Sequence, residues 1–177
     1  EKWLAKYPEF YSGNGQLCYT AHGKDTYDVM TTLCAEKIEQ SLRWYPADEY
    51  PQYKSVLLGQ MDNVAMCGCT TCSKMKSEHN DSNSAALMKF MHDVGKKVNA
   101  WMALEENAEY RRENFKYMFF AYLDTSRPPF TEDENGNIHI KKNPSNKDTD
   151  RRCPANRWII IPIQHLAINQ HISDARQ

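Results

Sequence analysis

The sequence has few glycines and no long hydrophobic run, and both absences exclude classes of function. Only seven glycines stand in 177 residues, and none forms the glycine-rich turn that cradles a dinucleotide or a nucleotide phosphate. The longest apolar run, WIIIPI at 158–163, is far shorter than the roughly 18 to 20 residues of a membrane span. We therefore expect neither a nucleotide-binding enzyme nor a membrane-spanning protein.

The charge balance excludes a further class of partner. The formal net charge is -1, and no long basic block is present. Binding to nucleic acid needs a basic surface that displaces counterions from the phosphates. We therefore expect no nucleic-acid partner.

The length allows one ordinary hydrophobic core, so residues 1–177 are interpreted as a single segment. The chain starts EKWLAKYPEF, without an initiator Met or a signal-peptide pattern, and stops at SDARQ directly after an apolar stretch. We therefore expect it to be a fragment of a larger domain.

Apolar spacing and turn residues predict strands that alternate with helices. Val29, Leu33, Ile38 and Leu42 recur at near-helical spacing before Pro46, and a longer segment further on has one broad apolar face. A turn with the sequence ENGN predicts a hairpin. The predicted elements are a strand at 15–21, a helix at 26–45, a buried strand at 54–60, a loop at 61–80, a helix at 82–105, and strands at 115–123 and 157–163.

This alternation predicts an α/β fold with a parallel sheet. Both an open doubly wound sheet and part of a (β/α)8 barrel fit the pattern. A complete barrel needs about 250 residues, so the chain would be the later half of one. Ligands collect at the carboxyl ends of parallel strands. The residues at or just beyond the carboxyl ends of the predicted strands are Asp62, Asn63, Tyr122, Asp124 and His165.

Three cysteines in six positions, Cys67, Cys69 and Cys72, are the sharpest local motif. A C-x-x-C pair lets two thiolates converge on one tetrahedral ion, and Cys67 adds a third. The fold alone decides whether Cys18, Cys153 or His79 supplies a fourth ligand. A disulfide within the loop or to Cys18 or Cys153 is an alternative, as are unpaired thiols. The flanking threonines and the additional cysteine do not favour a thioredoxin-type redox pair.

Asp62 is the candidate catalytic residue because it directly follows a predicted strand. A carboxylate there can act as acid or base, or accept a hydrogen bond from a sugar hydroxyl. The alternative is an aspartate that only begins the loop. Glycoside hydrolysis ordinarily needs two carboxylates, and Asp124 is the candidate that closes the next strand. Tyr122 is a candidate for stacking on a sugar ring, and His165 for a ligand contact.

The order of these motifs resembles a known family. YPEFYS and QLCYT, then VLLGQMDN with C-x-C-x-x-C, then FFAYLDTSRPP, are similar to an uncharacterised bacterial family of glycoside-hydrolase-like barrel proteins. This domain of unknown function is related in architecture to α-glucuronidase and hexosaminidase barrels. The resemblance covers most of residues 7–177.

The resemblance implies a (β/α)8 barrel in a secreted or surface-associated bacterial protein that recognises or cleaves polysaccharides. Asp62 and Asn63 match the polar pair of the family, Cys67, Cys69 and Cys72 match its cysteine loop, and Tyr122 matches its strand-end tyrosine. The leading hypothesis is a glycoside-hydrolase-like enzyme fragment without a cofactor. A noncatalytic glycan-binding barrel and a structural zinc module used for protein contact are the alternatives.

Overall fold

The computed structural model describes residues 2–60, 65–132, 134–135, 138–139 and 157–161. Its α-helices are α1 (Lys2–Lys6), α2 (Tyr27–Leu42), α3 (Thr70–Glu78) and α4 (Ser84–Ala103). Its strands are β1 (Ser55–Leu57), β2 (Lys116–Ala121), β3 (Thr131–Glu132), β4 (Ile138–His139) and β5 (Arg157–Ile161). Short 3-10 turns are η1 (Pro8–Phe10), η2 (Ala21–Gly23), η3 (Glu105–Tyr110) and η4 (Leu123–Thr125). No helix of the described residues is long and apolar enough to cross a membrane.

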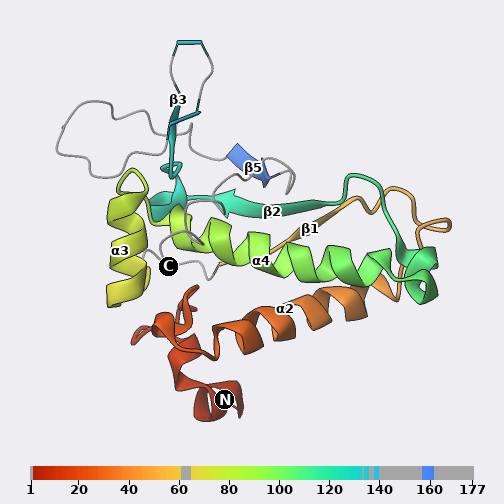
Figure 1. Cartoon of the computed structure of the whole chain (residues 1–177), viewed down its shortest axis with the longest axis horizontal. Coiled ribbons are helices and arrows are strands. Elements are labelled where there is room, and N and C mark those ends of the chain that lie inside the picture. Colours follow the sequence, from red (N-terminus) through yellow and green to blue (C-terminus); the bar gives the residue numbers. More distant parts are fainter. Residues whose placement is uncertain (1, 61–64, 133, 136–137, 140–156, 162–177) are drawn as a thin grey trace, which may run out of the picture.

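The described part of the chain is layered, with α4 between the sheet and α2 (Figure 1). Helix α4 forms because its apolar residues recur on one broad face, and Leu87, Met91, Val94 and Val98 are all buried. Strand β2 alternates, so that Tyr117, Phe119 and Ala121 point into the same core. The core therefore lies between α2, α4 and one face of β2.

The main sheet has the order β1-β2-β5. Strands β1 and β2 are parallel, with Val56 opposite Tyr117, and the chain between them contains α3 and α4. The alternation predicts a further parallel strand at 157–163, whereas β5 pairs antiparallel with β2. The described chain between β2 and β5 contains a 3-10 turn and the β3–β4 hairpin. An antiparallel neighbour needs no helical crossover, which accounts for the difference in direction.

The predicted helices at 26–45 and 82–105, the strand at 115–123 and the hairpin are confirmed. The strand at 15–21 is wrong, because that segment ends in the turn η2 and forms only an isolated bridge between Tyr11 and Leu17. The predicted loop at 61–80 contains α3. The predicted buried strand at 54–60 is short, and Leu57 is 47% exposed on its outer face.

Candidate metal centre

Four cysteines from two distant parts of the chain converge beside α3. Cys18 lies before η2, and the other three come from the segment that enters α3; the four sulfur atoms all lie within 4.8 Å of one another. The Sγ atom of Cys18 is 3.8 Å from that of Cys69 and 3.7 Å from that of Cys72. The group is therefore arranged so that it could hold a metal ion.

The sulfur distances distinguish between the possible states of these cysteines. A disulfide requires an S–S distance of about 2.05 Å, and no two cysteines in the described part of the chain are joined. Four ligands at a Zn–S distance of about 2.3 Å in a tetrahedron lie about 3.8 Å apart. The distances from Cys18 match this tetrahedral edge, so the geometry favours one ion at the centre of the cluster.

Helix α3 places two of the ligands. Cys69 is its N-cap residue, and the Cys69 sulfur accepts a hydrogen bond from the backbone N–H of Cys72 at 3.5 Å. The C-x-x-C spacing thus sets both sulfurs at the first turn of the helix. The positive end of the helix dipole there favours thiolate, which is the form that binds metal.

A left-handed turn presents Cys18 to the other three cysteines. Ala21, His22 and Gly23 have φ angles of 44°, 52° and 73°, which are costly for the two residues that carry a Cβ atom. The turn directs the backbone N–H of His22 at the Cys18 sulfur, 3.2 Å away. A Cβ atom on Gly23 would lie 2.5 Å from Oγ1 of Thr71. Only glycine therefore lets η2 approach α3 so closely.

Thr20 contributes a hydroxyl group beside the sulfur atoms. Its Oγ1 atom lies 3.2 Å from the sulfur of Cys72, 3.4 Å from that of Cys18 and 3.7 Å from that of Cys69. The side chain is buried, with 6% exposure. A hydroxyl in this place can donate to a thiolate, which is how residues around a metal site orient its ligands.

The surroundings shift the pKa values of Cys18 and Cys72 in opposite directions. A hydrogen bond from the Cys72 thiol, helped by Thr20 and the His22 N–H, holds the pKa of Cys18 well below its usual range despite burial. The same contact with Cys18 raises the pKa of Cys72, and burial raises that of Cys67. Within this pair of cysteines, the surroundings therefore favour the thiolate form of Cys18.

A polar cavity of about 350 Å³ adjoins the cluster. Cys67, Gly68 and Cys72 line it, together with Asp124. The other polar side chains that line it are Asn14, Ser73, Lys76 and Asn83. Nδ2 of Asn14 donates to the carbonyl of Ala65 at 3.0 Å, so Asn14 is linked to the segment that carries Cys67, Cys69 and Cys72.

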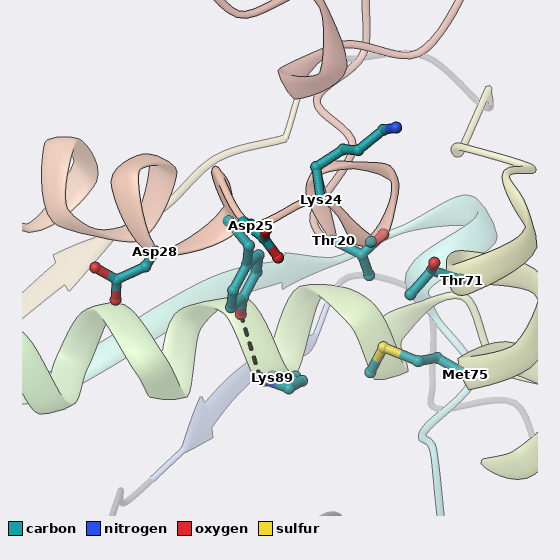
Figure 2. Close-up of a pocket in the computed structure, with 9 residues that line it drawn as sticks. Thr20, Lys24, Asp25, Asp28, Thr71, Met75 and Lys89 are labelled. Carbon is teal, nitrogen blue, oxygen red and sulfur yellow. Dashed lines mark hydrogen bonds between the residues drawn. The ribbon is translucent and has the colours of Figure 1, made fainter. Parts of the chain in front are cut away.

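A second cavity, also of about 350 Å³, lies among η2, α2, α3 and α4 (Figure 2). Among its cations, Lys89 pairs with Asp93, and the Tyr27 hydroxyl donates to the same carboxylate at 2.7 Å. Asp28, one of its two acidic residues, pairs with Lys97 at 2.8 Å. Figure 2 shows Lys24 extending away from Lys89. The paired charges of this cavity thus serve contacts between α2 and α4.

The structure brings together some of the predicted site residues and leaves others undescribed. Cys67, Cys69 and Cys72 meet with Cys18 as the fourth member, whereas Nδ1 of His79 contacts the carbonyl of Met75 at 2.8 Å, at the far end of α3. Tyr122 and Asp124 follow β2 directly, and Asp124 lines the polar cavity. Asp62, Asn63, Cys153 and His165 lie outside the described residues.

Sequence reasoning did not single out the groups around the sulfurs, which are Thr20 and His22. Both lie in the segment CYTAHG, close to a cysteine that was already a candidate. The glycine after His22 signals a turn. It does not indicate that the turn is left-handed or that it faces α3.

Comparison with known proteins gives a family and no closer relative. No curated protein and no solved structure matches the chain. The relationship to glycoside-hydrolase barrels therefore stays a prediction. The family match itself extends over residues 1–157, and the chain belongs to the family described as domain of unknown function DUF4838.

Proposed function

We propose that the chain binds one structural zinc ion through Cys18, Cys67, Cys69 and Cys72. The observation that carries this proposal is the distance of 3.7 to 3.8 Å between the Cys18 sulfur and those of Cys69 and Cys72. Closed sets of four cysteines are typical of structural zinc. An iron–sulfur cluster spreads its cysteines over several metal atoms, and so requires sulfurs that are farther apart.

The ion would join parts of the chain that are distant in sequence. Cys18 and Cys72 are 54 residues apart in sequence. Zinc held by four thiolates carries a formal charge of -2, and the His22 N–H, the Thr20 hydroxyl and the first turn of α3 all direct positive ends of dipoles at the sulfurs. Binding energy at such a site is also folding energy, so zinc would stabilise the segment between β1 and α3.

Metal analysis of the purified protein tests this function. We expect one mole of zinc per mole of chain, and no stoichiometric zinc in the Cys18→Ser variant. Cys34→Ser is the matched control, because Cys34 lies in α2 away from the cluster. The proposal is contradicted if the protein is expressed with zinc in the medium and purified without bound zinc. If it contains iron and inorganic sulfide, an iron–sulfur cluster replaces zinc as the proposed cofactor.

As a second function we propose a carbohydrate site at the carboxyl ends of β1 and β2, beside the cysteine cluster. The supporting observation is the polar cavity, whose carboxylate and amide groups, from Asp124, Asn14 and Asn83, are suited to sugar hydroxyls. It adjoins the chain that follows β1 and the chain that follows β2, a parallel pair. Ligands in α/β folds bind at this edge.

In this proposal the chain is the later half of a (β/α)8 barrel in a secreted or cell-surface protein. Asp62 acts as acid or base, or accepts from a sugar hydroxyl. Asn63, Tyr122 and His165 position the substrate, and Asp124 supplies the second carboxylate. Without a catalytic pair at the separation that hydrolysis requires, the same site would bind glycans and not cleave them.

Turnover and binding must be measured separately on the full-length protein. Asp62→Asn should abolish hydrolysis across a panel of polysaccharides while binding isotherms change little, and Asp124→Asn should weaken both. Binding that is lost only with Asp124→Asn, and no product with the unmodified protein, favours the noncatalytic alternative. Unchanged binding and turnover in both variants contradict a carbohydrate site here.

A further inference from the structure

The cysteine cluster has a fifth donor within reach. We infer that His22 is an alternative fourth ligand of the metal centre, which exchanges with Cys67. This inference rests on the zinc proposed above. It assigns the side chain of His22 a role that the sequence motif does not contain.

The position of the His22 ring supports the assignment. Its Nε2 atom is 3.9 Å from the Cys67 sulfur. The ring therefore lies beside the position that the Cys67 sulfur would leave vacant, and it would move toward the other three sulfurs to bind there. The backbone N–H of the same residue already contacts Cys18, so η2 holds His22 beside the centre.

The His22 ring also has a hydrogen-bond partner for the state in which it is not a ligand. Its Nε2 atom lies 3.0 Å from the carbonyl oxygen of Tyr11, which accepts a hydrogen bond if Nε2 is protonated. The ring therefore has two neighbours, the Tyr11 carbonyl and the Cys67 sulfur. The left-handed backbone of His22, with φ of 52°, is a local cost of the kind that clusters at functional sites.

Cys67 is the ligand best placed to leave. It precedes the N-cap of α3 by two residues, whereas Cys69 and Cys72 are fixed by the helix turn. Its neighbour Gly68 has open space where a side chain would stand. Cys67 also lines the polar cavity, which can receive its side chain. Cys18 is held in addition by the His22 N–H and Thr20.

The exchange breaks one Zn–S bond and forms one Zn–N bond. The lone pair on Nε2 makes the new bond, so the imidazole proton is then on Nδ1, and the released Cys67 thiolate takes a proton from solvent. The formal charge of the centre changes from -2 to -1. Both sets, four cysteines and three cysteines with one histidine, are common in structural zinc sites.

Cobalt substitution tests the inference, because the sulfur-to-cobalt charge-transfer absorption grows with the number of thiolate ligands. We expect four-thiolate spectra from the unmodified protein and from His22→Ala. Cys67→Ser should still bind one cobalt, with a three-thiolate spectrum. Cys67→Ser combined with His22→Ala should bind cobalt and zinc at least tenfold more weakly than Cys67→Ser alone. Cys67→Ser combined with His79→Ala is the matched control and should bind like Cys67→Ser.

A second measurement avoids dependence on the folding of the variants. The zinc-loaded protein is alkylated with iodoacetamide, and the bound zinc and the modified cysteine are read by native and peptide mass spectrometry. Chains modified only at Cys67 should keep their zinc, and the same modification in His22→Ala should release it. Equal affinity of Cys67→Ser with and without His22 overturns the inference, as does zinc loss from every chain alkylated at Cys67. An unmodified protein without zinc or cobalt overturns the proposed metal centre as well.

Discussion

Different kinds of contact connect the chain around the carboxyl ends of the parallel strands β1 and β2 and around their amino ends. At the carboxyl ends, the cysteine cluster proposed to bind zinc connects η2 to α3 through sulfur atoms, a threonine hydroxyl and a left-handed turn. At the amino ends, the chain before β1 packs through a tyrosine cluster, defined as Tyr45, Tyr50 and Tyr53, whose ring centroids are 4.7 to 5.8 Å apart.

The amino end is tied to its neighbours by ordinary contacts. The backbone N–H of Ala47 donates to the carbonyl of Glu109 at 2.8 Å, and the Arg112 guanidinium donates to the carbonyl of Tyr45. Next to it, Arg43 lies over the ring of Trp101 at 4.9 Å. Aromatic pairs and cation–π contacts each contribute about 0.5 to 1.5 kcal/mol and need no cofactor. The comparison therefore predicts that removing metal affects one end of the sheet and spares the other.

Metal removal should give the largest effect. Chelation of zinc should lower the free energy of unfolding by about 4 kcal/mol or more, in the range reserved for lost metals and disulfides. Hydrogen exchange measured by mass spectrometry should rise in residues 16–24 and 65–78 and change little in residues 43–54 and 105–112. If all four segments lost protection from exchange equally, the predicted difference between the two ends would be wrong. Readdition of zinc is the control, and should restore the original pattern.

The Gly23→Ala substitution should have the next largest effect. The φ angle of Gly23 is +73°, and the new Cβ would lie 2.5 Å from the Thr71 hydroxyl oxygen. Strain of this kind costs about 1 to 3 kcal/mol, and it would also separate Cys18 from α3. The midpoint temperature of thermal unfolding should fall, and so should the zinc affinity measured by chelator competition. Gly59→Ala is the matched control, because nothing lies within 4 Å of a Cβ atom built there.

Thr20→Val should change the metal affinity more than the fold. The substitution keeps the shape of the side chain and removes the hydroxyl that lies 3.2 Å from the Cys72 sulfur. Loss of an outer-shell partner typically lowers metal affinity by about 10- to 100-fold, which chelator competition will measure. Thr31→Val is the control, since Thr31 is equally buried but donates to the Asp28 carbonyl within α2. Equal zinc affinity in the two variants contradicts the role of Thr20.

The elements with strong periodicity could be predicted, and those without it could not. Helix α4 has twenty residues with a continuous apolar face, so its pattern is unambiguous. Helix α3 has nine residues, TTCSKMKSE, of which only Cys72 is buried. Its polar sequence offers no amphipathic signal, and its start is determined by the Cys69 cap. The segment at 15–21 has strand-like composition, but the left-handed residues that follow turn the chain away from a strand.

The sequence predicted the three-cysteine motif of the candidate site, but it did not predict which residue completes the site in the fold. Spacing alone indicated that Cys67, Cys69 and Cys72 can share an ion. The fourth member had three candidates, and the choice of Cys18 depends on the turn at Ala21 to Gly23 and on the close approach of Gly23 to Thr71. These are tertiary contacts between residues about 50 positions apart, which no local pattern encodes. The Asp62 hypothesis stays a prediction, because that residue lies outside the described part of the chain.

The smallest effect should come from the amino end, with Arg43→Ala. The guanidinium of Arg43 lies 4.9 Å from the ring centroid of Trp101 and 5.7 Å from that of Tyr110, and these two rings stack on each other at 5.4 Å. A cation–π contact at an exposed site contributes about 0.5 to 1 kcal/mol, so the midpoint of urea unfolding should fall slightly. Zinc content and zinc affinity should stay unchanged, since this contact is at the opposite end of the sheet from the sulfurs. A loss of zinc affinity in Arg43→Ala would mean that the two ends are coupled through α4, which carries Trp101 near its end and packs against α3 near its start.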